Sequence, residues 1–181
     1  MKIHCQTERL ILREINSDDL QDLFELDSDP EVHRYLGNNP FTDLKQSDDV
    51  VNSLKDQYRK NGIGRWAVIL RETGEFLGWA GLKYEKDARP GMQFFDLGYR
   101  LKQKYWGQGY ATEAAIASRD YFFTKMNGNI LNAGAHIENI ASNRILRKIG
   151  MTLDETFIYD GAEHNWYTME RTSWEQIIKE Q

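Results

Sequence analysis

Apolar positions along the chain fall into short runs with two kinds of spacing, and this pattern predicts a mixture of strands and helices. Continuous or alternating apolar runs predict strands at residues 9–14, 66–70, 76–82, 94–101, 130–137, 152–159 and 165–171. Helical spacing and capping residues predict helices at residues 17–27, 30–37, 42–60, 139–150 and 172–179, and another that begins near Gln108. The order contains no repeat and no obvious linker, so we expect one α/β domain over residues 1–181.

A glycine turn between the strand at 94–101 and the next helix carries the clearest chemistry. The stretch from Asp96 to Ala115 reads DLGYRLKQKYWGQGYATEAA. Gly107 and Gly109 lack a Cβ, so the backbone can turn sharply there and its N–H groups can approach a ligand closely. The following helix adds the unpaired N–H groups of its first turn and the positive end of its dipole. This arrangement predicts a pyrophosphate site that needs neither a lysine nor a metal.

The spacing of these glycines excludes two common nucleotide-binding motifs. A P-loop requires GxxxxGK followed by Ser or Thr, and no such string occurs in the chain. A dinucleotide fingerprint requires GxGxxG, but Thr112 stands at the third glycine position. Taken alone, the GQG string fits an ordinary strand-to-helix turn as well as it fits a phosphate site. Its interpretation therefore depends on the rest of the chain.

A second segment, ENIASNRILRKIGM from Glu138 to Met151, predicts a short helix that is capped near Asn139 and ends at Gly150. This segment, the opening TERLILRE and the GYRL and YWGQGYATEA strings together resemble the GNAT superfamily of N-acetyltransferases. Within the superfamily they are similar to the branch that includes the ribosomal-protein alanine N-acetyltransferases. The motifs follow the family's order and span nearly the whole chain, which favours this interpretation over an isolated turn.

The resemblance implies both a fold and an activity. The implied fold is a mixed, strongly twisted sheet of about six or seven strands, splayed at its middle and flanked by helices, with the cosubstrate in the cleft. The implied activity is transfer of an acetyl group from acetyl-CoA to a primary amine, by direct attack in a ternary complex. A protein N-terminal α-amino group and a small amine, such as a polyamine, an amino acid or an antibiotic, both stay open as acceptors. A different class of function, a non-catalytic acyl-CoA-binding protein on the same fold, also stays open.

The resemblance further implies which residues hold acetyl-CoA. The phosphate motif corresponds to Trp106, Gly107, Gln108, Gly109, Tyr110, Ala111 and Thr112. Trp106 departs from the Arg or Gln of the general pattern but resembles this branch. The strand with Tyr99 and Leu101 is expected to pair with the pantetheine arm and to supply an N–H donor to the oxyanion, and Asn139 to hydrogen-bond the pantetheine.

Candidate acid–base residues follow from the chemistry of amine acetylation. Ser142 is expected to face the thioester sulfur and protonate the leaving thiolate, because this helix lacks the Tyr that many relatives use. The attacking amine must lose a proton, and Asp96, just before Gly-Tyr, is the first candidate for the general base. Glu138 is a second candidate, and Glu163 and His164 in a late loop are further ones.

Composition narrows the function classes further. The net charge of -5 argues against nucleic acid as the main ligand, and it favours a cationic acceptor only weakly. No apolar run approaches the roughly 18 to 20 residues that a membrane helix needs, and the N-terminus lacks a signal-peptide pattern, so we expect a cytoplasmic protein.

Cys5 is the only cysteine, which disfavours an acyl-cysteine intermediate. The four histidines are too far apart to predict a metal site, and the sequence leaves a homodimer open.

Two groups of side chains near the motifs are candidates for contacts with ligands. Basic residues lie beside the phosphate turn and on the second-motif helix, where they could meet the phosphates of coenzyme A: Arg100, Lys102, Lys104, Arg144, Arg147 and Lys148. Tyr35 and Phe41 lie in the region that in relatives helps to cover the acceptor, although ordinary packing explains both residues as well.

Overall fold

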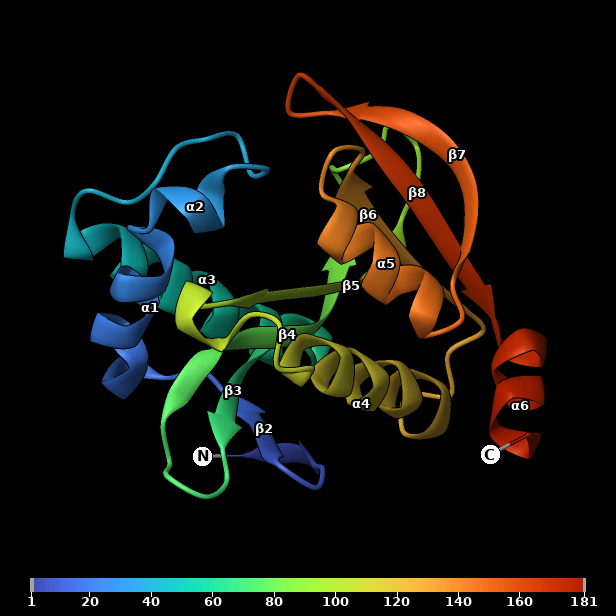
Figure 1. Cartoon of the computed structure of the whole chain (residues 1–181), viewed down its shortest axis with the longest axis horizontal. Helices are drawn as coiled ribbons and strands as arrows, with labels where there is room; N and C mark the ends of the chain where they lie inside the picture. The colour runs from blue at the N-terminus through green and yellow to red at the C-terminus, as the bar shows by residue number, and fades with distance from the viewer. Residues whose placement is uncertain (1, 181) are drawn as a thin grey trace.

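Eight strands form one sheet in the computed structural model, which describes residues 2–180 (Figure 1). The strands are β1 Ile3–Gln6, β2 Leu10–Glu14, β3 Arg65–Leu70, β4 Phe76–Glu85, β5 Phe94–Leu101, β6 Ile130–His136, β7 Thr152–Tyr159 and β8 Ala162–Glu170. Their order across the sheet is β1-β2-β3-β4-β5-β6-β8-β7. Every neighbouring pair is antiparallel except β5 and β6, which run parallel. This is the mixed sheet that the sequence predicts.

Helices cover both faces of this sheet. On one face lie α1 Leu20–Asp27, α2 Pro30–His33 and α3 Leu44–Asn61, and on the other α4 Tyr110–Thr124, α5 Ile140–Lys148 and α6 Arg171–Lys179. Short 3-10 turns occupy Ser17–Asp19 and Gln103–Tyr105. None of the helices within residues 2–180 combines the length and the apolar character needed to cross a membrane.

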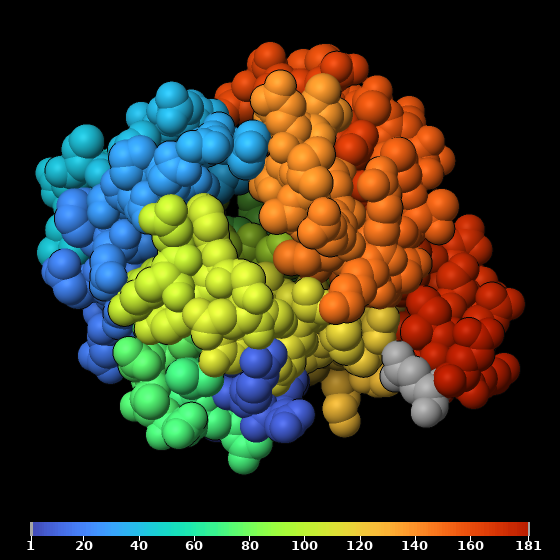
Figure 2. Space-filling view, in the orientation of Figure 1, coloured from blue at the N-terminus to red at the C-terminus, as the bar shows by residue number. Residues whose placement is uncertain are grey.

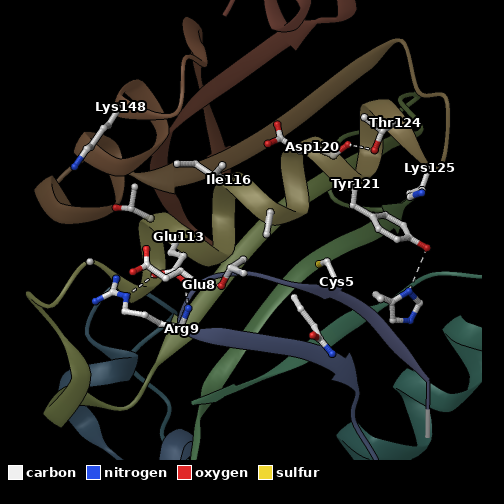
Figure 3. Close-up of a pocket in the computed structure, with 16 residues that line it drawn as sticks. Cys5, Glu8, Arg9, Glu113, Ile116, Asp120, Tyr121, Thr124, Lys125 and Lys148 are labelled. Carbon is white, nitrogen blue, oxygen red and sulfur yellow. Dashed lines mark hydrogen bonds and ion pairs between the residues drawn. The ribbon is translucent and has the colours of Figure 1, made fainter. Parts of the chain in front are cut away.

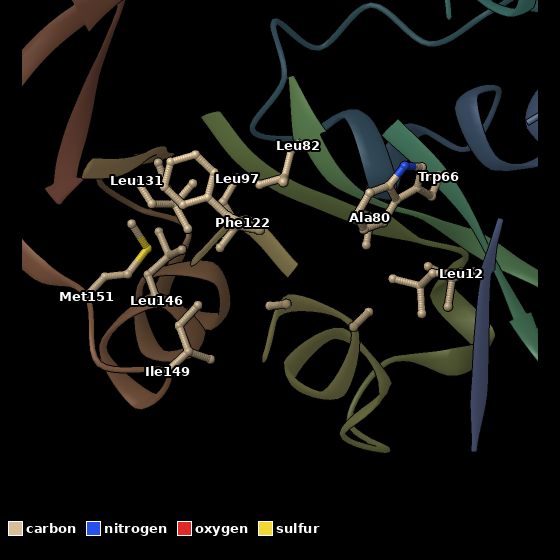
Figure 4. Close-up of a cluster of buried hydrophobic side chains, with 14 of the residues drawn as sticks. Leu12, Trp66, Ala80, Leu82, Leu97, Phe122, Leu131, Leu146, Ile149 and Met151 are labelled. Atoms are coloured by element: carbon tan, nitrogen blue, oxygen red, sulfur yellow. The ribbon is translucent and has the colours of Figure 1, made fainter. Parts of the chain in front are cut away.

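The larger hydrophobic cluster lies between the sheet and α4 (Figure 4). Ala114, Ala115 and Ser118 of α4 are fully buried, and their small side chains let the helix lie close to β4 and β5. The alanine spacing in the sequence predicts this close contact. Because α4 is fixed in this way, the position of its first turn relative to β5 is fixed as well.

The sheet parts between β5 and β6. Their only backbone pairing among the described residues joins Asp96 to Asn132, whereas β4 pairs along the whole of β5. Beyond this point the two strands diverge toward their carboxyl ends. Figure 2 shows a hollow between the blue and yellow-green segments and the orange segment that contains α5. The predicted splay is therefore present, and it opens a cleft.

Several element boundaries differ from those predicted. Strand β1 is not predicted, because it has only four residues, two of them polar. Strand β8 begins at Ala162 rather than at Asn165, since Asp160 and Gly161 both adopt left-handed conformations and close a tight hairpin. Glu163 and His164 therefore lie in a strand and not in a loop. Helix α3 is capped by Asp43, one residue later than predicted.

Candidate active site

The phosphate turn adopts the conformation that its glycines allow. Gly107 has φ +74° and Gly109 has φ +82°, values in the left-handed region that favours glycine. Gly109 is the N-cap of α4, and no side chain caps the helix there. The first-turn N–H groups of α4 are therefore left for a ligand. A Cβ built on Gly107 would meet no heavy atom of residues 2–180 within 4 Å, so the turn is open on this side.

Side chains from the connection between β1 and β2 brace this turn from behind (Figure 3). Arg9 donates from Nη1 to the carbonyl oxygen of Gln108 at 3.0 Å and from Nε to Glu113 Oε2 at 2.7 Å. Thr7 Oγ1 donates to the other oxygen of Glu113 at 2.5 Å. Burial raises the pKa of the Glu113 carboxyl, but the hydrogen bonds from Thr7 and Arg9 outweigh it and hold that pKa below its usual range. An ionised Glu113 thus fixes Arg9 against the turn.

Trp106 ties the turn to the end of β5. Its indole Nε1 donates to the carbonyl oxygen of Leu101 at 2.7 Å, and its ring lines the cleft. Gln108 does not line the cleft; its side chain donates to the carbonyl oxygen of Lys104 at 3.0 Å. Among the residues of the phosphate motif, the cleft is lined by Trp106, Gly107, Gly109, Tyr110, Ala111 and Thr112.

The edge of β5 that faces the cleft presents free backbone groups. Lys102 donates its N–H to Leu77 of β4 at 2.9 Å, so even-numbered residues of β5 point their backbone groups toward β4. By alternation, the backbone groups of Leu97, Tyr99 and Leu101 point toward β6, which has already diverged. The carbonyl oxygen of Leu101 accepts from Trp106, so the backbone groups of Tyr99 and the N–H of Leu101 are the part of this edge that is open to an extended ligand.

The opposite side of the cleft is formed by α5. Asn139 caps this helix, since its Oδ1 accepts from the N–H of Ser142 at 3.1 Å. The hydroxyl of Tyr99 reaches across from β5 and lies 3.1 Å from both Oγ and the carbonyl oxygen of Ser142. Burial raises the pKa of the Tyr99 phenol, so it stays protonated at neutral pH. The sequence gives no sign that a tyrosine from another element meets Ser142.

Asp96 lies where β5 and β6 part, and it lines the cleft. Its carboxylate pairs with Arg65, whose guanidinium also donates to the carbonyl oxygens of Gly81 and Asp96. Burial raises the pKa of the Asp96 carboxyl, and Arg65 opposes this rise. Asp96 is thus a partly buried carboxyl group that lines the cleft and pairs with Arg65.

The other candidate bases lie in different surroundings. Glu138 is exposed and does not line the cleft, and Glu163 is exposed on β8 and does not line it either. His164 does line the cleft, and burial lowers the pKa of its imidazole. Of the four candidates, Asp96 and His164 can reach a molecule in the cleft. Nowhere in residues 2–180 do three His, Cys, Asp or Glu side chains gather as metal ligands.

The predicted basic residues divide into two groups. Arg100 pairs with Asp27, and Lys102 binds Asp22 at 2.7 Å and Glu25 at 2.6 Å. These two cations are therefore engaged away from the phosphate turn. Arg144 and Lys148, one turn apart on α5, line the cleft as Arg100 does, whereas Lys104 and Arg147 do not line it. Together with the phosphate turn, Arg144 and Lys148 make that end of the cleft suited to anions.

The cleft as a whole has a volume of about 990 Å³ and joins two unlike ends. One end contains the phosphate turn with Arg144 and Lys148, and the other contains Asp96 with many aromatic side chains.

Residues 9–152 match the acetyltransferase (GNAT) domain family. The chain belongs to the GNAT acetyltransferase family. This confirms the resemblance noted in the sequence.

Relatives of this GNAT acetyltransferase include an uncharacterised N-acetyltransferase, p20, from Bacillus licheniformis, which is 35% identical over 145 residues, or 79% of each chain. Among solved structures, a GNAT-family acetyltransferase from Bacillus anthracis has a TM-score of 0.77 at 27% identity, over 95% of this chain and 99% of that one. RimL, a ribosomal L7/L12 α-N-protein acetyltransferase in complex with coenzyme A, has a TM-score of 0.75 over 93% and 98% of the two chains, and its 17% identity shows a shared fold only.

Proposed function

We propose that this GNAT acetyltransferase transfers the acetyl group of acetyl-CoA directly to a primary amine in a ternary complex. The observation that carries the proposal is the continuity of one cleft, which joins an open phosphate turn, a free strand edge and the partly buried carboxyl group of Asp96. A cosubstrate bound along the first two would present its thioester near the third.

Backbone groups of this chain would hold most of acetyl-CoA. The first turn of α4 and the glycine turn fit the pyrophosphate, because no side chain caps their N–H groups. The space beside the Cα of Gly107 is also open, since no described heavy atom lies within 4 Å of where a Cβ would be. Arg144 and Lys148 fit the remaining phosphate. The free edge of β5 fits the amides of the pantetheine arm, and an N–H of Tyr99 or Leu101 would stabilise the developing oxyanion.

Asp96 and the Tyr99–Ser142 pair would then move the protons. An amine must be neutral to attack, and Asp96, directly or through water, accepts its proton. The amine nitrogen forms a bond to the carbonyl carbon and the carbon–sulfur bond breaks. Ser142 then donates its hydroxyl proton to the thiolate and regains one from Tyr99, whose hydroxyl lies 3.1 Å away, and Tyr99 is reprotonated by water from the cleft. We propose no role in the reaction for Glu138, which lies outside the cleft.

Direct transfer fits the surroundings of Cys5 better than an acyl-enzyme does. Cys5 lines a separate groove beside α4 and does not line the cleft. Burial raises the pKa of its thiol to about 12, so the nucleophilic thiolate is scarce at neutral pH.

Two measurements test this function. Calorimetric titration should show one molecule of acetyl-CoA bound per chain. Release of free coenzyme A, followed with a thiol reagent, should then depend on an added amine. Acetyl-CoA binding without amine-dependent release would support the non-catalytic alternative, and absence of binding by the folded protein would refute both.

A further inference from the structure

We propose that the acceptor is a primary amine on an uncharged, aromatic body, and not a polyamine or a basic peptide. The inference rests on the proposed function and adds the chemical class of the acceptor. We call the end of the cleft that contains Asp96 and the aromatic side chains the acceptor end. Two of its features support the proposal: the balance of its charges and a continuous series of aromatic rings.

Every carboxylate that lines the acceptor end is already paired with a cation that also lines it. The pairs among the described residues are Arg34 with Glu31, Arg65 with Asp96, Lys83 with Glu85, and Arg100 with Asp27. Asp96 is needed for the proton of the reacting amine. A second ammonium group, as in a polyamine, would therefore meet no free carboxylate and would have to break an existing ion pair.

The acidic balance of the whole chain does not change this conclusion. Acidic side chains near the acceptor end, such as Asp160 in the β7–β8 turn and Glu163 on β8, do not line the cleft. Their charges face solvent, where salt screens them. The weak expectation of a cationic acceptor, based on the net charge of -5, therefore does not describe the site itself.

One wall of the acceptor end is a chain of aromatic rings, each in contact with the next. Successive centroid distances are 5.4 Å for Tyr35–His136, 5.3 Å for His136–His164, 5.8 Å for His164–Phe157, 5.3 Å for Phe157–Trp166 and 4.7 Å for Trp166–Phe94. All six rings line the cleft, and we call them the aromatic wall. Rings at such spacings favour a further flat ring in edge or offset contact.

Cations already lie over two rings of the aromatic wall and over Trp79 opposite. Arg89, paired with Glu155, lies 5.1 Å from the Phe157 centroid and 4.6 Å from that of Trp166. Across the cleft, Trp79 lies between Arg65 at 5.3 Å and Arg100 at 5.0 Å. Cation–π attraction at these rings is therefore already satisfied.

The aromatic wall is also covered from above. Tyr35 follows α2 and reaches His136 at the end of β6. A Cβ on Gly37 would lie 2.7 Å from the carboxylate of Asp160, so this segment touches the β7–β8 turn. Figure 2 shows the blue segment meeting the orange one over the hollow. A thin, flat acceptor suits such a covered space.

The test compares tryptamine, an amine on an uncharged aromatic body, with spermidine and with a lysine-rich peptide that has a free N-terminus. We expect kcat/KM for tryptamine to exceed that for each cationic acceptor at least tenfold. Equal or higher kcat/KM for spermidine or the peptide would overturn the inference and leave acetyl transfer standing. If no amine is acetylated, the proposed function fails. The inference is then decided by binding to the complex of the protein with coenzyme A: a lower Kd for tryptamine than for spermidine supports it, and the reverse overturns it.

A matched pair of variants locates the effect. Phe157→Ala removes a ring of the aromatic wall, and we expect KM for tryptamine to rise about fivefold while the Kd for acetyl-CoA is unchanged. Ile158→Ala is the control, because Ile158 is next in β7, is 68% exposed and does not line the cleft. An unchanged KM in Phe157→Ala would contradict the role of the wall.

Discussion

Replacement of Gly107 by Ala tests whether the backbone of the glycine turn binds coenzyme A. Gly107 has φ +74°, and Gly74, in the turn between β3 and β4, has φ +76°. A Cβ at either position would meet no described heavy atom within 4 Å. An alanine in this conformation costs about 1–2 kcal/mol of stability. Gly107→Ala and Gly74→Ala should therefore lower Tm by a similar amount, roughly 2–8 °C for a chain of this size.

Only the Gly107 variant should lose affinity for coenzyme A. Gly107 lines the cleft and Gly74 does not. If the added methyl group displaces the pyrophosphate from one N–H donor, the lost hydrogen bond to a charged group is worth about 1.5–3 kcal/mol. That energy corresponds to a rise in Kd of roughly 10- to 100-fold.

Calorimetric titration of both variants with coenzyme A measures this difference, and thermal unfolding without ligand checks that their stabilities match. The Gly74 variant removes the effect of backbone strain from the comparison. A Kd for Gly107→Ala within about twofold of the Kd for Gly74→Ala would refute the assignment of the turn as the phosphate site.

Three further substitutions address the rest of the site. Tyr99→Phe removes the hydroxyl next to Ser142 and should lower kcat about tenfold with little change in Kd for acetyl-CoA, and an unchanged kcat would exclude the proton relay. Asp96→Asn should lower kcat by about 10²-fold or more. Because burial raises the pKa of Asp96, wild-type kcat should fall as pH drops through that raised pKa; the variant should lack this fall, and a pH profile that keeps it would rule out Asp96 as the base. Glu113→Ala frees Arg9 from behind the turn and should weaken coenzyme A binding severalfold, as titration would measure.

The sequence predicts most of the fold because the hydrophobic pattern and the turn residues agree with each other. The run of small residues in α4 predicts a helix pressed against the sheet, and the glycine turn predicts an open helix start; the structure has both. Strand β1 escapes prediction because an edge strand of four residues leaves no periodic signal, and its pairing with β2 depends on tertiary context.

The site is harder to predict from the sequence than the fold is, because its contacts join residues that lie far apart in the chain. The bond between Tyr99 and Ser142 spans 43 positions, and the pair between Arg65 and Asp96 spans 31. No local pattern encodes either contact, since each arises only when the sheet parts and the helices pack. The residue types of Ser142 and Asp96 could be chosen by motif, but their partners could not.

The single parallel contact in the sheet has an evolutionary consequence. Because β5 and β6 run side by side in the same direction, the chain must cross back between them, and α4 is that crossover. Its first turn therefore begins where β5 ends, beside the cleft, whatever side chains it carries. The proposed phosphate site would then depend on chain topology and on the glycine turn, whereas the rings and charges opposite are ordinary side chains on other elements. Mutations at the acceptor end can accordingly change substrate preference without loss of the acetyl donor, so that new enzymes can diverge from a common scaffold in small steps.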